Sequence, residues 1–200
     1  MIISVIFVLL FLAFLMGIIM VPKIDGKINM IKVAVMGIMA IFCYQSFWAF
    51  MFQLVGIPVN LKSTCISMAA AVLLLWGMII KKKKMQRIFV RITDIAVLAV
   101  LAGIVIAVSL HMFTPYLRLS YINSDPANHF NDAMVIVKQG VLGKHIYFSA
   151  FVNAMFIEIF SPILIVSKYY KAFIFADIFM HVLEVWMCYV LMLTVSERSE

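Results

Sequence analysis

Apolar residues dominate the chain in runs of about twenty, which is the length that carries an α-helix across the ~30 Å hydrocarbon core of a bilayer. Short polar segments separate these runs. The pattern predicts an all-α fold, a polytopic transmembrane helical bundle of about six spans in a single transmembrane domain, residues 1–200. The predicted spans are 2–21, 31–54, 64–80, 92–113, 148–167 and 172–195.

The longest polar interruption, 114–147, follows the fourth predicted span. Within it, Ser124 or Asp125 suits a helix N-cap, Pro126 suits the first helical position, and Gly140 suits the stop. Between these signals apolar residues recur at helical spacing, with polar residues on the other face. The segment therefore predicts a short amphipathic helix that lies on the membrane surface.

Composition supports the membrane assignment and excludes other classes. The sequence is 66% hydrophobic and only 12% charged, whereas a soluble domain is nearer half apolar and a quarter charged. The formal charge of +7 does not indicate nucleic-acid binding, because the basic residues gather in short segments between predicted spans. The three cysteines fall inside apolar segments, without the spacing of a metal site or a disulfide framework.

The distribution of basic residues predicts the orientation. With six spans, one set of loops holds eleven lysines and arginines and the other holds five. The richer set, which includes the run 81–84, is expected in the cytoplasm and against anionic membrane lipid. Both termini and the loop 114–147 are then expected on the extracytoplasmic side of the cell membrane.

A first group of polar residues, Asp125, His129 and Asp132, lies at the start of the predicted surface helix. His129 and Asp132 are three residues apart and therefore neighbours on one helix face. Two carboxylates and an imidazole can take a proton from a hydroxyl group or bind a divalent cation. The simpler interpretation is that Asp125 is a helix cap and that the other two form a solvated face.

A second group, Asp177, His181 and Glu184, lies on one face of the last predicted span, at positions i, i+4 and i+7. Glu158 in the fifth predicted span is a candidate fourth member. Ionisable residues within a span usually face a bundle interior or water. Three interpretations stay open: a buried polar seam between helices, a cavity wall for a charged substrate, and a proton path.

The segment Asn123-Ser124-Asp125-Pro126-Ala127-Asn128-His129-Phe130, with its following helix and Gly140, resembles the first extracytoplasmic loop of GT-C-type integral-membrane glycosyltransferases. That superfamily includes relatives of protein mannosyltransferase and aminoarabinose transferase. The resemblance implies a polyprenyl-phosphate-linked sugar as donor and transfer on the extracytoplasmic face. It also implies that Asp125 is the catalytic base or a metal-linked carboxylate, supported by His129 and Asp132.

Stabilisation of the leaving lipid phosphate needs a cation, for which a divalent metal at Asp125 and basic side chains are candidates. The basic candidates on the same predicted side are Arg118, Lys138 and Lys144. Members of the superfamily have more spans, so the resemblance implies an amino-terminal part of such an enzyme. The alternatives are a non-catalytic membrane subunit with other membrane subunits as partners, and a transporter that uses the acidic and histidine residues of the spans.

Overall fold

The computed structural model describes residues 2–20, 28–81, 88–113, 124–142, 148–160 and 169–196. Almost all of these residues are helical, which confirms the all-α class, and one pair of two-residue parallel strands is also present. The elements in chain order are α1 (Ile2–Met20), β1 (Ile28–Asn29), α2 (Met30–Leu54), α3 (Leu61–Lys81), β2 (Ile88–Phe89), α4 (Ile92–Phe113), α5 (Ser124–Gln139), α6 (Phe148–Phe160) and α7 (Tyr169–Ser196).

Five helices of the described chain, namely α1, α2, α3, α4 and α7, are long and apolar enough to cross a membrane. Their bounds lie within three residues of the predicted spans. Polar caps explain two of the starts. The side chain of Asn29 accepts a hydrogen bond from the backbone N–H of Ile31, and that of Asn60 accepts from the N–H groups of Lys62 and Ser63.

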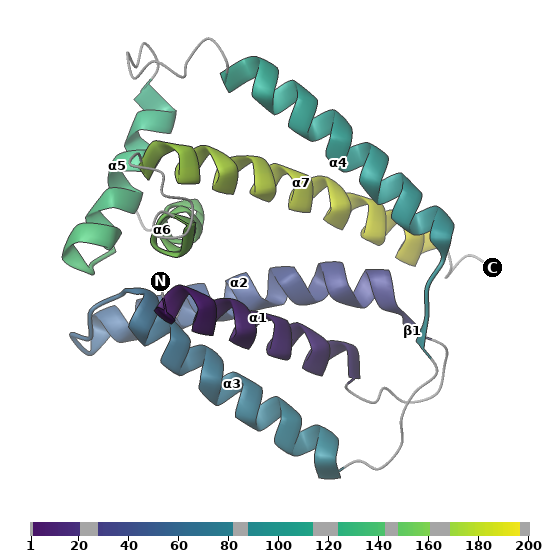
Figure 1. Ribbon diagram of the computed structural model, residues 1–200, viewed down its shortest axis with the longest axis horizontal. Coiled ribbons are helices and arrows are strands. Elements are labelled where there is room, and N and C mark those ends of the chain that lie inside the picture. The colour runs from purple at the N-terminus through teal and green to yellow at the C-terminus, as the bar shows by residue number, and fades with distance from the viewer. Residues whose placement is uncertain are drawn as a thin grey trace.

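The predicted fifth span, 148–167, is described only in part. That part is α6, a helix of 13 residues and therefore about 20 Å long, which is shorter than a bilayer core. Figure 1 shows α6 end-on, whereas the five long helices lie across the view. Side chains on all sides of α6 are buried, as expected for a mostly apolar helix that is surrounded by protein. Residues 161–167 lie outside the described chain.

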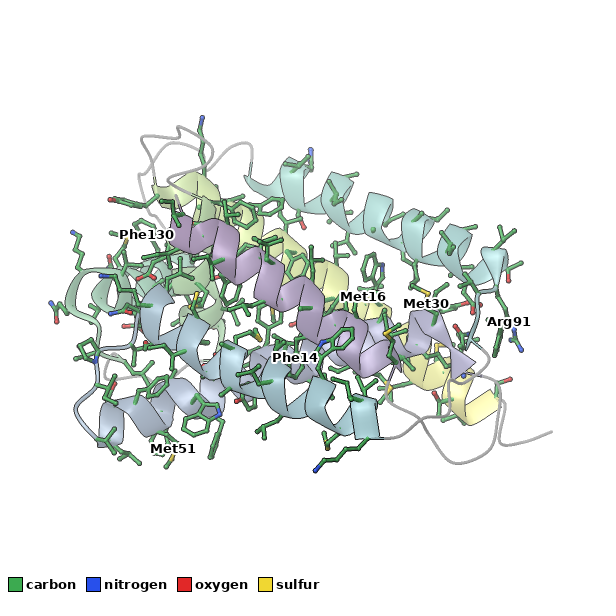
Figure 2. All side chains as sticks on the ribbon, turned by 60° about the horizontal axis from the view of Figure 1, so that its bottom comes forward. Phe14, Met16, Met30, Met51, Arg91 and Phe130 are labelled. Atoms are coloured by element: carbon green, nitrogen blue, oxygen red, sulfur yellow. The ribbon has the colours of Figure 1, made fainter. Side chains whose placement is uncertain are left out.

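The two ends of the bundle differ. Figure 1 shows α5 and α6 at the end where α1 begins, and Ser196 at the opposite end, near the start of α4. Figure 2 shows the same separation, with Phe130 of α5 and Arg91 at opposite ends. The expectation that both termini lie on one side depended on a sixth crossing. In the described chain, the start of α1 and the end of α7 lie at opposite ends of the bundle, as Figure 1 shows.

Helices α1, α2 and α3 form one packed unit. The polar residues in the middle of the second predicted span face α3: Tyr44 donates to the backbone carbonyl of Ser67 (3.0 Å), and the Ser67 hydroxyl donates to Gln45 Oε1 (2.7 Å). Helices α1 and α3 approach closely at Gly17, where a Cβ would lie 2.5 Å from a methyl carbon of Leu75.

Helix α7 joins this unit to α4. Aromatic contacts hold α7 against α2 and α6, with ring centroids 6.0 Å apart for Phe42 and Phe179 and 5.2 Å apart for Phe156 and Phe179. On its other side the indole of Trp186 donates to the backbone carbonyl of Leu98 in α4 (2.9 Å). Helix α7 therefore lies between α4 and the rest of the bundle, as Figure 1 shows.

Candidate functional site

Helix α5 is fixed at both ends to other parts of the bundle. At its C-terminal end Gly140 has φ +68°, and its carbonyl accepts a hydrogen bond from Val59 N–H (2.7 Å) in the α2–α3 turn. Near its N-terminal end Phe130 packs edge-on against Phe173 of α7, with centroids 5.4 Å apart. Between these points Ala133 and Ile136 are buried in the core. The predicted helix and its stop at Gly140 are therefore present, although the helix begins slightly earlier than predicted.

The three residues predicted to be catalytic have different surroundings. Asp125 lies in the first turn of α5, and its side chain lies outside the described part of the structure. His129 is half-buried, with Nδ1 3.5 Å from the hydroxyl of Ser149 in α6. The Oδ2 atom of Asp132 is buried and has no hydrogen-bond partner among the described residues. The interpretation of a fully solvated face is therefore wrong for Asp132.

The polar residues of α7 form one continuous group. His181 lies between two carboxylates, with Nε2 3.7 Å from Asp177 Oδ2 and Nδ1 3.2 Å from Glu184 Oε2. The side chains of His181 and Glu184 are 53% and 60% exposed. This excludes the interpretation that they form a seam buried within the described bundle.

The structure brings the two predicted groups together. His129 of α5 lies within electrostatic range of Asp177 of α7, and Asp177 in turn contacts His181. The contact between Phe130 and Phe173 holds the two helices in this arrangement. A charged and polar line therefore runs from α5 at one end of the bundle along α7 toward its middle.

Glu158 does not join this line. Its carboxylate accepts a hydrogen bond from the backbone N–H of Leu61, the first residue of α3. Burial raises the pKa of the Glu158 carboxyl, and the Leu61 hydrogen bond opposes that shift. A carboxylate at a helix N-terminus also interacts favourably with the helix dipole. Glu158 therefore anchors α6 to α3.

The predicted cations and the predicted metal site are only partly described. Lys138 is exposed in the last turn of α5, whereas Arg118 and Lys144 lie outside the described residues. In the described part of the chain no group of three or more His, Cys, Asp or Glu side chains could hold a metal ion. The side chain of Asp125 lies outside that part, so a divalent metal bound at Asp125 remains a prediction from the sequence.

Asp94 is a buried polar residue outside the two groups that the sequence singles out. It is only 3% exposed. Its carboxylate accepts hydrogen bonds from Asn29 Nδ2 (2.8 Å) and from the hydroxyl of Tyr189 (3.0 Å). These three residues, the Asp94 cluster, join the start of α2, the start of α4 and the end of α7. The only feature of the sequence that could have indicated this cluster is the presence of polar residues near the ends of three separate spans.

No protein family, curated protein or solved structure was found to match the chain. The class of protein therefore follows from the structure alone. The described chain is helical, with five helices that are long and apolar enough for a membrane protein. Across one end of the bundle lie two shorter helices, α5 and α6. The polar line from His129 to Glu184 is the part of the described structure best suited to chemistry or to partner binding.

Proposed function

We propose that the protein is a glycosyltransferase, or part of one, that uses a polyprenyl-phosphate-linked sugar on the extracytoplasmic face of the membrane. The observation that carries this proposal is the contact of α5 with α7, where the rings of Phe130 and Phe173 lie edge-on with their centroids 5.4 Å apart. It sets the polar start of α5 against a membrane-spanning helix, at one end of the bundle. A lipid-linked substrate needs such a place, because its chain lies in the bilayer and its sugar phosphate lies at the surface.

The proposed reaction is a direct displacement. Asp125 takes the proton from an acceptor hydroxyl, and the oxygen attacks the anomeric carbon of the donor sugar. The bond from that carbon to the phosphate oxygen breaks, and polyprenyl phosphate leaves. His129 and Asp132 position the acceptor, and Asp177 orients the imidazole of His129. Lys138 lies thirteen residues after Asp125 on the same helix, about 20 Å further along its axis, and is therefore too far from the reacting carbon to compensate the charge of the phosphate.

The charge distribution supports the extracytoplasmic location. With five crossings the lysines and arginines divide into ten at the end that carries the run 81–84 and six at the end that carries α5. Lys168, Lys171 and Arg198 change sides relative to the six-span count, but the bias keeps its direction. The α5 end is therefore expected outside, together with the N-terminus, and the C-terminus is expected in the cytoplasm.

Thiol labelling tests this location. Cysteine at Asn128, which is exposed on α5, should react with a membrane-impermeant reagent in intact cells, in a background without Cys43, Cys65 and Cys188. Cysteine at Lys81, exposed at the other end of the bundle, is the matched control and should react only after permeabilisation. Labelling of the Lys81 cysteine in intact cells, and of the Asn128 cysteine only after permeabilisation, would place α5 in the cytoplasm and contradict the proposal.

Loss of the proposed base tests the chemistry. The purified protein in lipid vesicles should release polyprenyl phosphate from one donor in a panel of polyprenyl-phosphate sugars. Asp125→Asn should lower this rate at least ~100-fold, because general-base catalysis contributes about 10²–10⁴-fold. Asn131→Ala, on the exposed face of the same helix, should change the rate less than about twofold. Release that is unaffected by Asp125→Asn would contradict the proposed base.

A non-catalytic membrane subunit is the second candidate, and the exposure of His181 and Glu184 favours it. In that case none of the donors would be turned over, while substitutions in α7 would still abolish function in cells. The transporter interpretation loses support because Glu158, its proposed fourth polar residue, bonds to α3 instead of extending the α7 line.

A further inference from the structure

One face of α7 is open along most of the helix and follows a regular spacing. Its residues recur at intervals of four and three: Asp177, His181, Glu184, Cys188, Leu191 and Val195. We call this face the α7 seam. His181, Glu184 and Cys188 are exposed, and Leu191 and Val195 are 55% and 70% exposed. The seam therefore has an ionisable half near α5 and an apolar half toward Ser196.

The ionisable half of the seam lies at membrane depth. Glu184 is thirteen residues after the start of the candidate span Lys171–Ser196 and twelve before its end. Contact with lipid is favourable for the apolar side chains of Leu191 and Val195. Placing a charged carboxylate near the bilayer centre is unfavourable, at about 2.5–3.5 kcal/mol even on insertion-based scales. The membrane alone therefore does not account for this face.

No helix of the described chain covers the seam beyond its first residue, Asp177, which is 33% exposed and lies near His129 of α5. The residues of α7 that are buried against α2, α4 and α6 lie on its other faces, among them Ala176, Leu183 and Val190. Within the described residues, the ring nitrogens of His181 contact only its own helix neighbours, Asp177 and Glu184. The seam is therefore open to a molecule from outside the described bundle.

The spacing of the seam indicates what covers it. Alternating intervals of three and four residues keep one stripe of side chains facing a second helix, as in a left-handed helix pair. Transmembrane helices pair in this geometry too. A continuous stripe from Asp177 to Val195 spans about 27 Å at 1.5 Å per residue, which is most of a membrane crossing.

The charge of the seam indicates the chemistry of that helix. Two carboxyl groups flank one imidazole along the ionisable half, so acidic groups outnumber basic groups on the seam itself. A second copy of the chain, paired by two-fold symmetry, would place like-charged groups opposite each other, which is unfavourable. A lysine or arginine at the same depth would compensate the charge of both carboxylates.

We propose that the α7 seam binds a membrane-spanning helix of another protein that carries a lysine or arginine at the depth of Glu184. The ionisable half pairs with the basic side chain of the partner helix. Toward Ser196, the partner helix packs on Cys188, Leu191 and Val195. This proposal does not depend on the proposed glycosyltransferase activity. An enzyme that has a partner and a non-catalytic subunit could each use the open seam to bind a helix.

A designed helix and the native cysteine of the seam test the proposal. The full chain, with Cys43 and Cys65 replaced by serine, is co-expressed with a single-span leucine-alanine helix that carries one central lysine. Two versions of this probe carry a cysteine four residues before or four residues after the lysine. Oxidation should join Cys188 to one of them at least ~10-fold more than to the same probe with leucine at the centre, because one buried charge pair exceeds about 1.4 kcal/mol.

The control variant Asp177→Asn/Glu184→Gln keeps the shape of the seam and removes its charge. It should reduce crosslinking of the lysine probe to the level of the leucine probe, and its thermal unfolding midpoint shows that it folds. Equal crosslinking of both probes, or a lysine probe indifferent to this variant, would overturn the proposal. Crosslinking of Cys188 predominantly to Cys188 would also overturn it, since the seam would then bind a second copy.

Discussion

Asp94→Ala should lower the free energy of unfolding by about 3 kcal/mol. The substitution leaves the amide of Asn29 and the hydroxyl of Tyr189 without their acceptor in a site where Asp94 is 3% exposed. Each unpaired buried donor costs about 1–3 kcal/mol. Because the Asp94 cluster joins α4 and α7 to the start of α2, the loss should appear as cooperative unfolding in detergent, measured by denaturant titration.

A double-mutant cycle separates this cluster from general damage to the helix. Tyr189→Phe alone removes one hydrogen bond and should cost about 1 kcal/mol. In the Asp94→Ala background the same change should cost almost nothing, because the tyrosine hydroxyl has already lost its acceptor. If Tyr189→Phe costs the same in both backgrounds, the hydrogen bond to Asp94 does not contribute to stability.

Gly140→Ala should destabilise the protein by about 2–4 kcal/mol and release the C-terminal end of α5. The backbone of Gly140 has φ +68°, which side chains rarely adopt, and an added Cβ would lie 3.0 Å from Pro58 Cβ. The strain falls on the hydrogen bond from Val59 to the Gly140 carbonyl. Limited proteolysis should cut α5 faster in the variant, and the thermal midpoint should fall.

Gly56→Ala is the matched control, because Gly56 has a similar φ of +74° but nothing within 4 Å of the added Cβ. It should cost only the backbone penalty, about 1 kcal/mol, and leave proteolysis of α5 unchanged. The difference between the two variants measures the close approach of α5 to the α2–α3 turn. Equal losses for both would mean that this approach does not hold α5.

Local patterns predicted much of the fold. The apolar runs placed five long helices to within three residues, because membrane length and end signals act locally. The stop of α5 at Gly140 was also predicted, because a positive φ at a helix end favours glycine.

The orientation of α6 could not be predicted in the same way. Its sequence is mostly apolar, and neither periodicity nor composition distinguishes a helix that faces lipid from one enclosed by protein. Its transverse position is set by contacts with five other helices, among them the Glu158 carboxylate at the start of α3. The predicted location of the C-terminus depends on whether this segment crosses the membrane.

The candidate site was predicted residue by residue but not as an arrangement. His129 and Asp177 were each singled out from local spacing, whereas their proximity depends on how α5 packs against α7, 48 residues further along. The Asp94 cluster was missed for the same reason, because Asn29, Asp94 and Tyr189 lie far apart in the sequence. Such contacts are set by tertiary packing, which no single segment encodes.

The enclosure of α6 has a consequence for biogenesis. Each of the five long helices is apolar and long enough to enter the bilayer by itself, as independent insertion requires. The described part of helix α6 is shorter than that, and nine of its 13 residues are buried. Because its place exists only after its neighbours have assembled, we expect α6 to dock at a late step of maturation. Newly inserted chains would then need protection from aggregation at this apolar segment.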